Sequence, residues 1–121
     1  MKNAVNWFEI PAADFDRAVK FYDAIMSKPL RRESFGGMPH AVFAYEGEGV
    51  SGAVSKMDRN SPSPQGTLVY LNVEGYLDKA VENTAKAGGR ILSEKMSIGE
   101  NGFVAIIADT EGNTVGLHSM K

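Results

Sequence analysis

The chain has 121 residues with a net charge of −2 at pH 7, and 43% of its residues are hydrophobic. This length fits one domain with its own core, and the composition is ordinary for a globular protein. The small net charge argues against a nucleic-acid surface. The lack of cysteine excludes disulfides, thiolate metal sites and a cysteine nucleophile. No apolar run resembles a signal peptide or a membrane span, so we expect a cytoplasmic protein with neither nucleic-acid nor membrane partners.

The first predicted element is a short strand. Phe8 and Ile10 alternate with Trp7 and Glu9, and this period of two is typical of a half-buried strand. Pro11 has no amide hydrogen for a ladder bond, so we expect it to close the strand.

An amphipathic helix is predicted next. Asp14 stands where an N-cap belongs, because its carboxylate can accept from the free amides of the first helical turn. The helix should stop before Pro29, since the residue before a proline is disfavoured in helical geometry. One helical face is apolar, with Phe15, Ala18, Val19, Tyr22, Ile25 and Met26.

Three strands and a linker complete the first half. We predict the strands at residues 31–35, 39–45 and 50–56, with hairpin turns at the intervening glycines. His40 falls in the second of these strands, and the pattern leaves open which face of the sheet it occupies. Residues 57–66 have the serine- and proline-rich composition of a linker.

The second half repeats the first. We predict a strand at residues 67–73, a helix opening at Leu77 and ending at Gly88-Gly89, and strands at 90–97, 103–109 and 114–118. The chain is therefore expected to be a single α+β domain, 1–121, of two βαβββ modules, 1–56 and 67–121, joined by the linker 57–66. Such a duplicated chain can bury its apolar sheet faces by pairing its two modules or by pairing with a second chain.

Four stretches resemble a known superfamily. They are residues 14–18 (DFDRA), 73–80 (VEGYLDKA), 87–89 (AGG) and 109–113 (DTEGN). Together they make the chain similar to the vicinal oxygen chelate superfamily, the glyoxalase I, bleomycin-resistance and extradiol-dioxygenase group. The resemblance implies two curved, mostly antiparallel half-barrels with the helices outside. It also implies one small-molecule cavity on the concave faces, and a homodimer.

Enzymes of that group place up to four His, Gln or Glu metal ligands on the first, fourth, fifth and eighth strands. The corresponding positions here are Trp7, Leu68 (or Thr67) and Gly116, and residues 50–55 contain no usual ligand. A divalent ion needs several nitrogen or oxygen donors converging on one point. We therefore predict no cofactor, with a divalent metal only at an atypical site.

Strand alternation indicates which side chains take the place of the ligands. Successive residues of a strand point to opposite faces of the sheet, so the residues between those that pack on the helices should face the concave side. An apolar pocket with a few polar groups is typical of a small-molecule site. The predicted ligand-binding residues are Trp7, Glu9, Leu68, Tyr70, Asn72, Thr114 and His118.

Two classes of function follow. The first is a protein of glyoxalase/bleomycin-resistance type that binds a small, partly apolar molecule without a metal. The alternative is a lyase, an isomerase or a dioxygenase-type enzyme, either metal-free with Glu9 and His118 as base and acid, or with an atypical metal site of Glu9, His118 and His40. A structural interaction module is a third possibility.

Several of these residues also have a purely structural interpretation. Trp7 could plug a filled barrel, and Glu9 could be exposed at an open sheet edge. Asn72 could satisfy backbone groups. His118 lies near the end of the chain and could be a surface residue.

Overall fold

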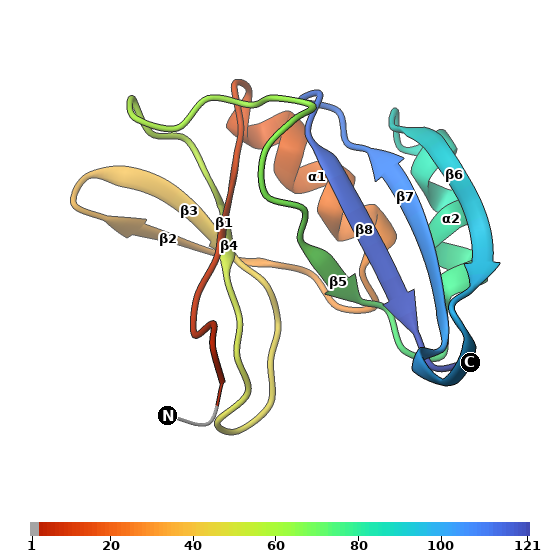
Figure 1. Cartoon of the computed structure of the whole chain (residues 1–121). Helices are drawn as coiled ribbons and strands as arrows, with labels where there is room; N and C mark the ends of the chain where they lie inside the picture. The colour runs from red at the N-terminus through yellow and green to blue at the C-terminus, as the bar shows by residue number, and fades with distance from the viewer. Residues whose placement is uncertain (1–2) are drawn as a thin grey trace.

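Two successive β-α-β-β-β units make up the computed structural model, which describes residues 3–121 (Figure 1). The predicted α+β order is confirmed. The first unit contains β1 (Glu9–Pro11), α1 (Phe15–Ile25), β2 (Arg31–Phe35), β3 (Met38–Val42) and β4 (Ala53–Ser55). The second contains β5 (Tyr70–Asn72), α2 (Leu77–Lys86), β6 (Arg90–Ser97), the 3-10 helix η1 (Gly99–Asn101), β7 (Phe103–Ala108) and β8 (Thr114–Ser119).

Each unit forms its own four-stranded sheet. The strand orders are β1-β4-β3-β2 and β5-β8-β7-β6. The pairs β1–β4 and β5–β8 are parallel and the other pairs are antiparallel, so both sheets are mixed. Neither sheet closes into a barrel, and the β2–β3 hairpin projects from the body of the molecule (Figure 1). β1 and β5 are therefore edge strands.

Helix α1 begins directly after Asp14, the predicted N-cap. The Asp14 carboxylate accepts a 3.1 Å hydrogen bond from the Arg17 amide, and it satisfies one of the donors that a helix start leaves free. The predicted apolar face is largely buried, but Phe21 is buried as well, with 1% of its surface exposed. The buried surface of α1 is therefore wider than one stripe.

The reason lies in the second unit, against which α1 packs. The Phe21 ring lies so close to Gly89 that a Cβ atom there would stand 2.6 Å from Phe21 Cε1. α1 also contacts α2 and β4, and in Figure 1 both helices lie behind the second sheet. The buried apolar residues of both units consequently form a single core.

Three predicted strands are shorter by two or more residues in the structure. The predictions of strands over residues 39–45, 50–56 and 67–73 are wrong in length, because only Met38–Val42, Ala53–Ser55 and Tyr70–Asn72 are paired as strands. One further bond, from the Phe43 amide to the Gly52 carbonyl at 3.0 Å, extends β3 toward the following turn. Residues 67–69 make one backbone bond to β8, through Val69. They otherwise border the cavities described below.

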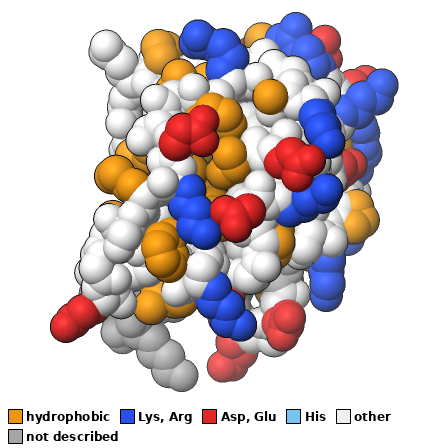
Figure 2. Space-filling view, turned by 90° about the vertical axis from the view of Figure 1, so that its right-hand side faces the viewer, with side chains coloured by type: hydrophobic (Ala, Val, Ile, Leu, Met, Phe, Trp, Pro, Cys, Tyr) orange, Lys and Arg blue, Asp and Glu red, His pale blue; other side chains and the backbone are white. Residues whose placement is uncertain are grey.

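The alternation within the strands is as predicted. Ile10, Leu71, Val73, Val115 and Leu117 are buried, whereas Trp7, Leu68 and Tyr70 are between 41% and 48% exposed. Figure 2 shows the side of the molecule that lies to the right in Figure 1, where acidic and basic side chains are interspersed. Within residues 3–121, the structure has no helix long and apolar enough to cross a membrane.

Candidate functional site

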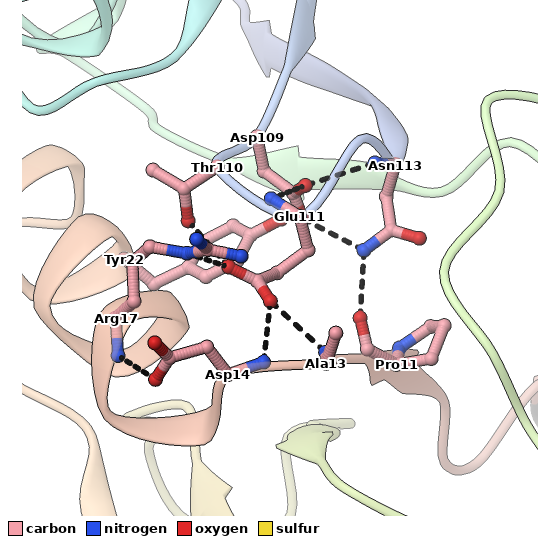
Figure 3. Close-up of polar contacts among 9 residues, drawn as sticks. All are labelled: Pro11, Ala13, Asp14, Arg17, Tyr22, Asp109, Thr110, Glu111 and Asn113. Carbon is pink, nitrogen blue, oxygen red and sulfur yellow. Dashed lines mark hydrogen bonds and ion pairs between the residues drawn. The ribbon is translucent and has the colours of Figure 1, made fainter.

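The turn of residues 109–113, just before β8, holds the two units together (Figure 3). The Tyr22 hydroxyl of α1 donates a 2.6 Å hydrogen bond to the Asp109 carboxylate, which is 5% exposed. The same carboxylate accepts from the Glu111 and Asn113 amides at 2.8 and 2.9 Å. Burial, together with the neighbouring negative charge of Asp109, raises the pKa of Tyr22 well above its ordinary value of 10.0. The phenol therefore stays a donor at any physiological pH.

Glu111 secures the start of α1 from the other unit. Its Oε1 accepts from the Ala13 and Asp14 amides at 2.9 and 2.7 Å, and its Oε2 accepts from Arg17 Nε at 2.7 Å. Burial would raise the pKa of Glu111. The hydrogen bonds from Arg17, the Asp14 amide and Thr110 outweigh it and lower the pKa below its ordinary value of 4.5.

Asn113 fixes the linker beside β1. Its Nδ2 donates to the Pro11 carbonyl at 2.7 Å, and its Oδ1 accepts from the Ser63 amide at 3.1 Å. The Thr114 hydroxyl donates to the Pro64 carbonyl at 2.8 Å. The turn of residues 109–113 thus positions three segments beside one another: the end of β1, the linker and the start of β8.

These three segments border a cavity of about 440 Å³. Three predicted ligand-binding residues, Glu9, Leu68 and Thr114, line it. The other lining residues are uncharged: Ile10, Pro11, Asn60, Ser63, Pro64, Gln65, Gly66, Thr67, Val69, Asn113 and Val115.

A second cavity of about 420 Å³ adjoins the first at residues 67–69, which line both cavities. The predicted residues Leu68, Tyr70 and Asn72 line it. Its remaining lining is mostly apolar and none of it is charged: Val5, Phe8, Met26, Phe43, Ala44, Val50, Ser51, Thr67, Val69 and Leu71. Trp7 and His118 line neither cavity.

The Glu9 carboxylate is held by three neighbours. Ser55 Oγ donates to Oε1 at 2.7 Å, and His40 Nε2 lies 3.2 Å from the same oxygen. The Trp7 indole Nε1 donates to Oε2 at 3.2 Å. The Glu9 side chain remains 25% exposed, while Ser55 is fully buried and His40 is 4% exposed. Ser55 and His40 therefore hold the carboxylate from the buried side.

The register explains why His40 meets Glu9. His40 on β3 pairs with Ser55 on β4, and residues directly opposite in neighbouring strands share a face of the sheet. The face of His40, which the sequence left open, is therefore the face of Glu9. His40 Nδ1 lies 3.0 Å from the Met38 carbonyl, and its ring makes an edge contact with Phe35. Nothing in the strand pattern indicated that Ser55 would be a partner of Glu9.

His118 lies in the second sheet. Its Nε2 is 2.6 Å from the Asn101 carbonyl of η1, and it pairs with Asn72 across β8 and β5. Within residues 3–121, no hydrogen bond or ion pair joins His118 to Glu9. The acid and base predicted as one pair thus have separate partners.

The positions of the implied metal ligands carry no donors for a metal. Gly116 is covered by the Tyr70 ring, Leu68 is apolar, and the Trp7 indole N–H is bonded to Glu9. Among the described residues there is no group of three or more His, Cys, Asp or Glu side chains that could hold a metal ion. The side chains present do not fit a divalent ion at these positions.

Comparison with known proteins identifies relatives over most of the chain. Residues 4–117 match the model of the Glyoxalase/Bleomycin resistance protein/Dioxygenase superfamily. A glyoxylase-like domain-containing protein of Didymella fabae is 33% identical over 116 residues, which cover 91% of this chain and 88% of that protein.

Solved structures share the fold at low sequence identity. A glyoxalase/bleomycin resistance protein from Albidiferax ferrireducens aligns with a TM-score of 0.73 and 16% identity, over 97% of this chain and 99% of that one. A fosfomycin resistance protein from Listeria monocytogenes aligns with a TM-score of 0.67 and 13% identity, over 98% and 92%.

Proposed function

The chain belongs to the Glyoxalase/Bleomycin resistance protein/Dioxygenase superfamily, and on this basis we propose that it binds a small, partly apolar molecule without a metal ion. The bound molecule would occupy the concave side near β1 and residues 67–72. The observation that carries the proposal is the pair of adjoining cavities, which are apolar or neutral except for one carboxylate. Cavities of this size, with a few polar groups among apolar ones, suit small-molecule ligands.

The chemistry of the usual ligand positions supports binding without a metal. An indole, an isobutyl group and a glycine supply no side-chain donors, and the nearest carboxylate, Glu9, is already bonded to Ser55, His40 and Trp7. We derive no catalytic step through a metal.

A second candidate is a metal-free lyase or isomerase with Glu9 as its base. The observation that favours it is the position of Glu9, a carboxylate at a cavity wall with a histidine beside it. A carboxylate within reach of a bound molecule can accept a proton from it. His118 would then need a separate role.

We also propose that the protein is a homodimer. Both sheets are open, and β6 exposes Leu92 and Met96, which are 47% and 53% exposed. A second copy could cover such exposed apolar surface. Analytical ultracentrifugation across a concentration series tests this, and a monomer at all concentrations would contradict it.

The first experiment is metal analysis of the purified protein, followed by titration with Ni, Zn, Mn and Fe(II) while the fluorescence of Trp7 is recorded. We expect no stoichiometric metal and no saturable response. Neutral aromatic and acyl compounds, screened with the same signal, should include saturable ligands. One equivalent of tightly held metal that is lost in both Glu9→Ala and His118→Ala would instead establish an atypical metalloenzyme.

A further inference from the structure

We propose that the cavity beside β1 selects a small organic cation, whose ammonium or amidinium group is bound by the Glu9 carboxylate. This inference rests on the proposed binding function and names the ligand class. It is carried by the charge of the cavity walls and by the hydrogen bonds that Glu9 already makes.

Charge is the first argument. Glu9 is the one charged side chain among the residues that line the two adjoining cavities, and neither lining contains Lys, Arg or His. An anion entering this space would meet a like charge. His40 contacts Oε1 from the buried side but lines neither cavity, so no basic side chain of the linings would attract an anion, whereas a cation would be attracted to the Glu9 carboxylate. Interactions between charges are stronger inside a protein than in bulk water.

The geometry of Glu9 is the second argument. Oε1 accepts from Ser55 Oγ and lies 3.2 Å from His40 Nε2, while Oε2 accepts only from the Trp7 indole N–H. An ionised carboxylate has about four acceptor sites, so Oε2 retains capacity for a further donor. The Glu9 side chain is held in position by its neighbours and is still 25% exposed, which is the arrangement that a preformed binding group requires.

The rest of the lining suits the remainder of such a ligand. Asn60, Gln65 and Thr67 add amide and hydroxyl groups to the lining of the same cavity. Leu68 is a shared wall of this space and of the uncharged second cavity, which Phe8 and Phe43 also line. A ring or short chain attached to the cationic group could lie against this wall.

The single tryptophan provides a direct probe of the site. Because Trp7 Nε1–H donates to Glu9, its indole N–H resonance in an NMR spectrum reports any change at the carboxylate. We would titrate the protein with phenethylammonium, phenethyl alcohol and phenylpropanoate, which have similar apolar bodies and differ in charge. The three titrations would be run at the same pH, so that the protonation of the protein is the same in each.

We expect the cation to bind roughly tenfold or more tightly than the alcohol, as a charge-assisted contact would give, and the anion to bind worst. The preference should disappear in Glu9→Gln. It should persist in Glu33→Gln, a matched control on the same sheet, because Glu33 lies opposite His40 and lines neither cavity.

The wild-type series decides the matter even if Glu9→Gln does not fold. Equal affinities for the cation and the alcohol, or a preference for the anion, would overturn the cation inference and leave the proposed binding function standing. The same follows if Glu9→Gln folds and keeps the preference. If none of the three compounds binds, both the inference and the proposed binding of small apolar molecules are wrong.

Discussion

The ring of Tyr70 lies directly over Gly116, so that a Cβ atom on residue 116 would stand 2.3 Å from Tyr70 Cδ1. Residue 116 is the position at which the superfamily resemblance implies a metal ligand on the last strand. The space that a ligand side chain would need is filled by an aromatic ring from β5. The packing of β5 against β8 therefore leaves no room for a metal-binding side chain at residue 116.

We expect Gly116→Ala to destabilise the protein by about 1–3 kcal/mol, because the added methyl group overpacks the Tyr70 ring. Urea unfolding monitored by circular dichroism measures the loss. In a Tyr70→Ala background, the same substitution should cost less than about 0.5 kcal/mol, since its clash is gone. An equal cost in both backgrounds would contradict the contact.

Tyr22→Phe should lower the free energy of unfolding by roughly 1–3 kcal/mol, because it takes a donor away from the buried Asp109 carboxylate. Because its folded pKa is raised, Tyr22 contributes stability fully below its ordinary pKa of about 10, and this contribution is lost as pH rises toward the folded value. Ultraviolet titration should show that Tyr22 stays protonated until alkaline unfolding. Tyr45→Phe, at a half-exposed position, is the control and should leave the unfolding midpoint unchanged.

Glu111→Gln should change how stability depends on acid pH. The folded pKa of Glu111 is lowered, so the stabilising contribution of its carboxylate is complete above the ordinary value of 4.5 and disappears as pH falls through the folded value. The variant should be less stable than the wild type near neutral pH, and the difference should shrink on acidification. Thermal unfolding between about pH 7 and pH 3 measures it. A difference that is constant over this range would show that the charge of Glu111 does not matter.

His118→Gln should leave the Trp7 indole N–H resonance where it is, whereas Glu9→Gln should move it. The reason is that Trp7 is bonded to Glu9, while His118 lies in the other sheet and is bonded to the Asn101 carbonyl of η1. Two-dimensional ¹H–¹⁵N spectra of the two variants are sufficient. Matching shifts in both would mean that the two residues act together after all.

Asn113→Ala should loosen the linker, because it removes the hydrogen bonds to the Ser63 amide and the Pro11 carbonyl. Limited proteolysis should then cut within residues 57–66 sooner than in the wild type. Asn60→Ala is a suitable control, because Asn60 lines the cavity but lies outside this set of bonds. Equal cleavage rates would show that Asn113 does not hold the linker.

The fold was open to prediction because its signals are local. The cap at Asp14, the apolar alternation around Leu71 and the glycine pair after α2 each act within a few residues. The burial of Phe21 was not predicted, since it depends on space left by Gly89, which is far along the chain and belongs to the other unit.

The candidate site was predicted only in part, for a similar reason. Alternation placed Glu9 and Leu68 on the cavity side, and both line a cavity. The partners of Glu9 depend on the register of β3 and β4, which turn lengths and pairing decide. The contacts of His40 and Ser55 with Glu9 could therefore not be predicted from alternation alone. The predicted proximity of His118 assumed that the two sheets present one shared face.

The bonds from Glu111 to the Ala13 and Asp14 amides have a consequence for synthesis in the cell. The amino end of α1 finds its acceptor almost a hundred residues later, in the turn before the final strand. A nascent chain cannot complete this helix start, or bury Tyr22 against Asp109, until that turn has left the ribosome. The first unit therefore gains these contacts only after the second unit has been synthesised. A chain stalled before residue 109 would present the amino end of α1 without them to chaperones and proteases.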